Sequence, residues 1–206
     1  QKQLFYKLEK MMEKYGLKAR LHAFECDAIL QGLEAELDDL FGMLAQKVMR
    51  VNRETNGYQK IKLRIKKENW KQKAWQAVLL CTERIRASMK EISQALEERL
   101  SQLLSEKQMK EQALAFIEEM YSFLEDWRLL RDNLAIFAGQ NGGDENVVWV
   151  EGDLRALPNS LVIYCQPVHA GETLQKAFFS QKKSVVLTSA TLTVGGSFRY
   201  FLGETG

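Results

Sequence analysis

The stretch "IRASMKEISQALEERLSQL", residues Ile85–Leu103, decides the fold of most of this chain. Its apolar residues recur every three or four positions, which is the spacing of one face of an α-helix: Ile85, Met89, Ile92, Leu96 and Leu103. The surrounding region, Asn69–Ala138, contains no Gly and no Pro, and a second apolar seam follows the first. That second seam comprises Ile117, Met120, Leu124, Trp127 and Leu134. One helix of this length would extend about 100 Å, so we expect a break in the polar stretch Ser105–Lys110 and an antiparallel helical hairpin.

Two further helices are predicted before this hairpin. Residues 1–15 carry apolar side chains at helical spacing, and Gly16 stands where a C-terminal cap belongs. A longer helix is predicted over Lys18–Val51, with an apolar stripe at Leu30, Leu33, Leu37, Leu40, Leu44, Val48 and Val51. Long helices with several seams indicate a mainly α fold, an antiparallel bundle of long helices with coiled-coil-like packing.

Apolar and basic residues alternate in "KIKLRIKK", Lys60–Lys67, which predicts a short strand with one wet, positive face. Cations that follow a phosphate backbone, together with an aromatic ring that stacks on bases, are suited to single-stranded DNA. The candidate DNA-binding residues are Lys60, Lys62, Arg64, Lys66, Lys67 and Trp70. Basic residues outnumber acidic ones from Lys60 to Lys90. The structural alternative is that this strip is solvated, with Trp70 in the core, and that its charge is neutralised across the bundle by Glu34, Glu36, Asp38 and Asp39.

The sequence changes character at "AGQNGGDEN", Ala138–Asn146, which predicts a linker at 139–146 between a helical domain, 1–138, and a C-terminal piece, 147–206. Strands are predicted at Val147–Val150 and Leu161–Gln166, and a short helix at His169–Phe179. A last strand is predicted at "SVVLTSA", Ser184–Ala190, whose apolar start is typical of a strand buried in a parallel α/β sheet.

Composition excludes several classes of protein. The chain has 206 residues and a formal net charge of +2, so it is not a polycation. Its three cysteines form no CxxC pair, and His22 and His169 have no partner at ligand spacing, so we expect no metal site, no iron–sulfur cluster and three reduced thiols in a cytoplasmic protein. No apolar run approaches the roughly 18 residues that a membrane span requires.

The last 60 residues resemble the DinG/XPD family of superfamily 2 DNA helicases. The segments that carry the resemblance are "VVWVEGD", "LVIYCQPVHAGETLQKAFF" and above all "SVVLTSATLTVGGSFRYFLG". In that family the Thr-Ser-Ala-Thr segment within the last of these is helicase motif III, which closes the first RecA-like domain. Residues 1–138 then look like the arch domain that these helicases insert before motif III. The resemblance implies a small C-terminal α/β piece of a RecA-like domain after a helical arch.

By this resemblance, Thr188, Ser189, Ala190 and Thr191 couple ATP hydrolysis to strand separation, and the arch guides single-stranded or forked DNA. ATP and Mg²⁺ would serve the whole helicase. The chain has neither a GxxxxGK[ST] loop nor an Asp-Glu-Ala-His box, so we expect an excised middle segment that does not hydrolyse ATP by itself. Exposed strand edges or helical seams are a route to dimerisation of such a piece. Two other interpretations stay open: a non-enzymatic helical interaction module, and part of a DinG-like protein repurposed as, or fused to, a nuclease.

Overall fold

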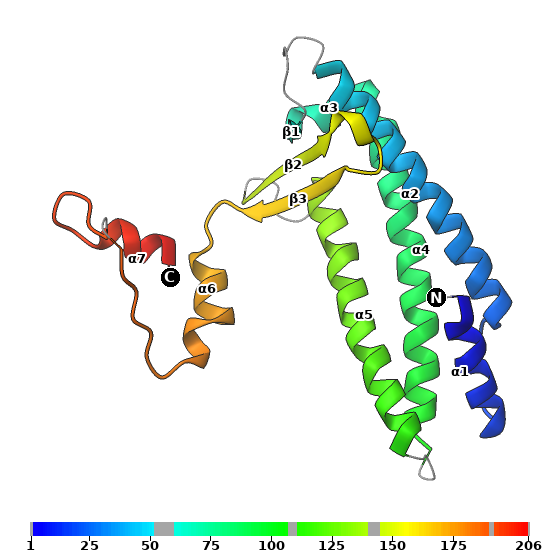
Figure 1. Cartoon of the computed structure of the whole chain (residues 1–206). Helices are drawn as coiled ribbons and strands as arrows, with labels where there is room; N and C mark the ends of the chain where they lie inside the picture. Colours follow the sequence, from blue (N-terminus) through cyan, green and yellow to red (C-terminus); the bar gives the residue numbers. More distant parts are fainter. Residues whose placement is uncertain (1, 52–59, 107–110, 140–144, 190–191, 206) are drawn as a thin grey trace.

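The computed structural model describes residues 2–51, 60–106, 111–139, 145–189 and 192–205. Long helices dominate it, as the sequence predicts, and a small sheet lies across one end of them (Figure 1). The helices of this body are α1 (Lys2–Lys14), α2 (Ala23–Val51), α3 (Lys67–Lys71), α4 (Lys73–Leu104) and α5 (Glu111–Phe137). Within the described residues, no helix is both long enough and apolar enough to cross a membrane.

Helices α4 and α5 form the predicted antiparallel hairpin. Helix α4 has 32 residues and α5 has 27, so the two extend about 48 and 41 Å at 1.5 Å per residue. The helix ends at Leu104, within one residue of the predicted break, and the next helix starts at Glu111; residues 107–110 of the predicted break lie outside the described residues. The two helices then lie side by side along most of their length (Figure 1).

Helix α2 begins five residues later than the sequence pattern predicts. Gly16, with a φ of 68°, closes α1 as expected, and the chain then turns before α2 starts at Ala23. The turn is held because the Glu25 carboxylate accepts a hydrogen bond from the His22 amide at 2.6 Å, while the His22 carbonyl accepts from the Glu25 and Cys26 amides. This local capping stops the helix from extending back to Lys18.

The sheet contains β1 (Lys60–Ile65), β2 (Asn146–Asp153) and β3 (Val162–Pro167) in the order β1-β2-β3, and both pairings are antiparallel. The strands predicted after residue 146 therefore pair with the basic strand that precedes α4. The register places Lys60 opposite Asp153 and Ile65 opposite Val148. β2 and β3, which follow the predicted linker at 139–146 in the sequence, thus pack with the helical body.

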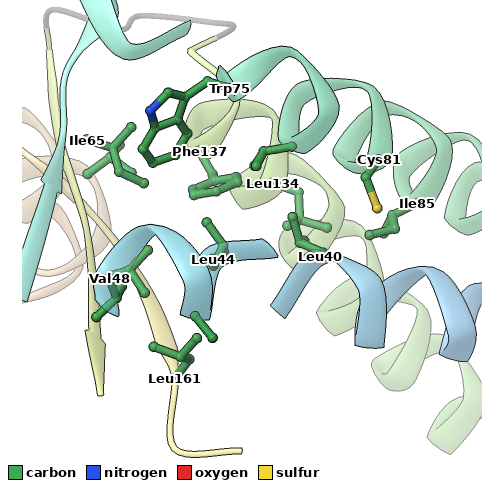
Figure 2. Packing of buried hydrophobic residues seen from close by; sticks show 14 of the residues in the cluster. Leu40, Leu44, Val48, Ile65, Trp75, Cys81, Ile85, Leu134, Phe137 and Leu161 are labelled. Carbon is green, nitrogen blue, oxygen red and sulfur yellow. The ribbon is translucent and has the colours of Figure 1, made fainter. Parts of the chain in front are cut away.

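One apolar core joins the sheet to the helices. Val148 and Val150 of β2, together with Leu161, are buried with residues of α2, α4 and α5. Figure 2 shows this cluster in close-up, with labelled side chains at Leu40, Leu44, Val48, Ile65, Trp75, Cys81, Ile85, Leu134, Phe137 and Leu161. Because every second residue of each strand enters this core, the opposite face of the sheet is turned to solvent.

A second core lies toward the other end of the long helices, where α1 packs on α2 and α4, and residues of α5 complete the cluster. It contains a fully buried charged residue, Arg99 of α4. Its guanidinium donates hydrogen bonds to the carbonyls of Ala95, at 2.8 Å, and Leu21. The same group lies 5.1 Å from the ring centroid of Phe5 in α1, so Arg99 ties α1 and the turn after it to α4.

The chain after Pro167 is arranged differently from the predicted parallel α/β piece. It contains α6 (Gly171–Ala177), a turn of 3₁₀ helix (Phe179–Gln181) and α7 (Arg199–Thr205), which lie apart from the helical body (Figure 1). The strand predicted at Ser184–Ala190 is wrong over its described part, because residues 184–189 have no regular secondary structure and Val186 is 85% exposed. A strand requires hydrogen-bonding neighbours, and residues 184–189 pair with none of the three strands of the described sheet.

Candidate nucleic-acid interface

The basic strand predicted from the alternating pattern is β1, and its outer face is positively charged. Ile61 and Ile65 point into the core, whereas Lys60, Lys62 and Arg64 are exposed. This is the period-two arrangement that the sequence predicted. The structure therefore brings three of the candidate DNA-binding residues together on one solvent-facing surface of the sheet.

The charge on this face is not uniform along the strand. Lys60 lies opposite Asp153, and Lys62 forms an ion pair with Glu151 at 3.1 Å. That ion pair lowers the pKa of the Glu151 carboxyl, an effect that partial desolvation opposes. Arg64, by contrast, lies opposite an aromatic residue, Trp149. Acidic residues of β2 thus partly neutralise the positive charge of the first half of β1. The residue of β2 that lies opposite Arg64 carries no charge.

A cleft of about 320 Å³ opens where β1 ends, and it extends the positive charge beyond Arg64. Lys66 and Lys67, which follow the strand, are exposed and line this cleft together with Arg64, Asn146 and one acid, Glu68. The turn is fixed because the Asn69 side chain accepts a hydrogen bond from the Lys66 amide at 2.7 Å. Three cations around one cleft make an arrangement that suits a phosphate group.

Trp70, the sixth candidate, is placed elsewhere. Its ring packs edge-to-face against Trp75, with centroids 5.3 Å apart, and against Phe137 of α5, at 5.4 Å. Gly139 also lies close enough that a β-carbon there would be 3.0 Å from the indole. The Trp70 ring thus serves packing between α3, α4 and α5, as the structural alternative holds for this residue.

An acidic residue of α2 neutralises part of the wider basic strip, Lys60–Lys90, as the structural alternative supposed, but it does so on α4. Glu36 pairs with Arg84 of α4 at 2.9 Å, so its charge is used between the two long helices. On α4 itself, Arg86 lies 3.3 Å from Glu83. On β1 itself, partial neutralisation comes from Glu151 of β2, a partner that the sequence pattern did not identify.

An aromatic pair, absent from the sequence-based candidates, lies on the same outer face. Trp149 of β2 and Tyr164 of β3 are partners in the register, and their rings stack with centroids 4.8 Å apart and planes 5° apart. The ammonium of Lys62 lies 5.8 Å from the Trp149 centroid. Alternation within "VVWV" puts Trp149 on the face opposite Val148 and Val150, so this pattern could have identified Trp149 as an outer residue. Its pairing with Tyr164 depends on the strand register, which the sequence does not reveal.

Of the four residues assigned to motif III, the structure describes Thr188 and Ser189. Thr188 and Ser189 are exposed in an irregular segment, and Ala190 and Thr191 lie outside the described residues. The described part of this segment therefore gives no geometry for its coupling role, which stays a prediction.

Burial favours the protonated form of the cysteine thiols. Burial raises the pKa of the Cys165 thiol to about 11, and it is also the main cause that raises the pKa of Cys26 and Cys81. Over the described ranges, no group of three or more His, Cys, Asp or Glu side chains could hold a metal ion. The sequence also lacks the phosphate-binding loop and acidic box that hold ATP and Mg²⁺, so no step through ATP is assigned to this chain's residues.

Comparison with known proteins relates the chain to one part of a longer protein. No model of a known protein family matches the chain. The 3'-5' exonuclease DinG of Bacillus subtilis (strain 168) is 31% identical over 185 residues, which make up 89% of this chain and 19% of that protein. Over most of its length, the chain is therefore similar to a segment of DinG, and it spans about a fifth of that relative.

Proposed function

We propose that this chain is a DNA-contacting segment of a DinG-like protein, and that the outer face of its sheet binds single-stranded DNA. The observation that carries the proposal is the gathering of exposed cations on β1 and around the cleft at its end: Lys60, Arg64, Lys66 and Lys67. The similarity to DinG supports DNA as the polyanion that these cations bind.

Packing against the helices holds this basic surface in a fixed position. The inner face of the sheet shares its core with α2, α4 and α5, so the exposed cations are held at fixed spacing by buried neighbours such as Ile61 and Ile65. A preorganised charged surface loses less entropy on binding than a mobile basic tail does. In the whole protein, the helical body would act as an arch that guides the strand.

The larger reaction is also part of the proposal. A helicase of this type would bind ATP and Mg²⁺ outside this chain, and the segment Thr188–Thr191 would couple hydrolysis to strand separation. In the full-length protein, replacing Ser189 and Thr191 by Ala should then preserve much of the ATPase rate and abolish unwinding. Equal loss of both activities would contradict the coupling role.

A second candidate activity for the whole protein is favoured by the name of its relative, a 3'-5' exonuclease. In that case the same basic face would deliver a 3' end to a nuclease site that lies outside this chain. The full-length protein separates the two: ATP-dependent unwinding supports the helicase, and degradation of single strands without ATP supports the exonuclease.

The DNA-binding claim is tested by salt titration with a labelled oligothymidylate, followed by fluorescence anisotropy. Replacing Lys60, Arg64 and Lys66 by Gln leaves the Lys62–Glu151 ion pair intact. If each contacts one phosphate, the slope of log K against log salt falls by about 2, which is roughly 20-fold in affinity between about 50 and 200 mM salt.

A matched control variant loses the same number of positive charges as the test variant, but at a distant site. Gln at Lys10, Lys14 and Lys18 removes three cations from α1 and the turn after it, toward the other end of the long helices (Figure 1). This variant should keep the wild-type slope. Equal slopes in both triple variants, or no binding of DNA by the wild type, would contradict the proposal; the second result would favour a non-enzymatic interaction module.

A further inference from the structure

We propose that the Trp149–Tyr164 pair is a stacking platform for an unpaired nucleobase, which makes the sheet face selective for single-stranded over duplex nucleic acid. This inference rests on the proposed function, since it concerns the same surface, but a different observation carries it: two parallel aromatic rings on the solvent face of the sheet. The cations of β1 would bind any phosphate backbone, whereas a stacking platform recognises a base.

The rings of Trp149 and Tyr164 lie on the outer face of the sheet and are not part of the apolar core. The inner residues of β2 and β3 contact the helices, with Val148 and Val150 buried and Cys165 packed against the same cluster. Trp149 and Tyr164 alternate with these residues and are partly exposed. Their mutual stacking leaves one ring face of each residue directed away from the other.

The two outer ring faces differ in their surroundings. On the β1 side, the Trp149 ring is approached by the Lys62 ammonium at 5.8 Å. On the other side, Tyr164 belongs to β3, which is hydrogen-bonded to β2 and forms an edge of the described sheet. The geometry therefore points to the edge-facing side of Tyr164 as the surface on which a base stacks, extending a row from Lys62 through Trp149 to Tyr164.

The distance between the stacking platform and the cations allows one DNA strand to contact both. Two strand spacings separate β1 from β3, a distance of roughly 10 Å, which is close to the length of three stacked nucleotides at about 3.4 Å each. A strand whose phosphates enter the cleft near Arg64 could thus place a neighbouring base on Tyr164. In a duplex the bases are already stacked and paired, so this second contact is lost.

The test compares three probes at one salt concentration: an oligothymidylate, a strand of equal length whose sugars lack bases, and a duplex. Tyr164→Leu removes the ring on which the base stacks, and Trp149→Leu removes the ring that supports it from behind. Phe at either position keeps the ring. The Leu variants should bind oligothymidylate about 5- to 100-fold more weakly, with unchanged affinity for the base-free strand. The Phe variants should bind all three probes as the wild type does.

A second readout does not depend on the stability of the Leu variants. A Tyr164→Trp variant carries an indole at the stacking position itself, so oligothymidylate should quench its tryptophan fluorescence more strongly than that of the wild type. Salt-sensitive binding with equal affinity for oligothymidylate and the base-free strand would overturn the platform while leaving the proposed function standing. No binding of any probe would overturn both.

Discussion

Replacing Arg99 by Ala should lower the free energy of unfolding by about 3–5 kcal/mol. The buried guanidinium donates hydrogen bonds to the carbonyls of Ala95 and Leu21, and hydrogen bonds to a charged group contribute about 1.5–3 kcal/mol each. Truncation also leaves a cavity beside Phe5, and this cost adds to the lost bonds. The Nε atom of Arg99 is buried without a hydrogen-bond partner among the described residues, which places the net effect nearer the lower bound.

The assay is urea unfolding followed by far-UV circular dichroism. With an m-value of about 2 kcal/mol/M, a loss of 3 kcal/mol moves the midpoint down by roughly 1.5 M. Arg99→Lys keeps the charge but cannot span both carbonyls, so an intermediate loss of about 2 kcal/mol is expected. Lys90, exposed on the same helix, provides the control, since its replacement by Ala should change stability by at most about 0.5 kcal/mol. If Arg99→Ala unfolds within 1 kcal/mol of the wild type at an unchanged m-value, the guanidinium is not the tie between α1 and α4.

Three further predictions concern packing, ionisation and thiol reactivity. Leu100→Ala, at a fully buried position of α4, should cost about 2–5 kcal/mol in the same urea assay; a cost below 1 kcal/mol would contradict the packing described. The lowered pKa of Glu151 means that its pairing with Lys62 stabilises the fold above the ordinary value of 4.5 and loses this effect as pH falls through the lowered pKa. The stability difference between the wild type and Lys62→Gln should therefore be larger at pH 7 than at pH 3, and a difference that is independent of pH would refute the pairing. Because the pKa of Cys165 is raised to about 11, native protein should react with iodoacetamide at pH 8 roughly 100-fold more slowly than denatured protein, and rapid labelling of Cys165 in the native state would argue against its burial.

Local sequence patterns predicted the helices and the strand that depend on interactions within one segment of the chain. The seam from Ile85 to Leu103 and the polar break after it specify two long helices, because helical periodicity and the absence of Gly and Pro act within one segment. The alternation of Lys60–Ile65 likewise predicted both the strand and its exposed basic face. Gly16 marked the end of α1 because its φ of 68° suits glycine.

Those local patterns could not predict which distant segments of the chain pair as strands. The apolar run Val185–Leu187 has the composition of a buried strand, yet a strand also needs partners, and the described chain pairs β2 with β1 and β3 instead. Composition alone cannot tell an exposed apolar segment from a buried one. The stacking of Trp149 on Tyr164 could not be foreseen for the same reason, since it depends on the register of β2 with β3.

The measurement that tests the central claim most directly is photochemical crosslinking of the 206-residue chain to an oligothymidylate, with the modified peptides identified by mass spectrometry. If single-stranded DNA lies across the outer face of the sheet, the adducts fall within β1, β2 and β3, with Trp149 or Tyr164 carrying the base. Adducts confined to the chain after Pro167, or to α1 at the other end of the helices, would contradict the account.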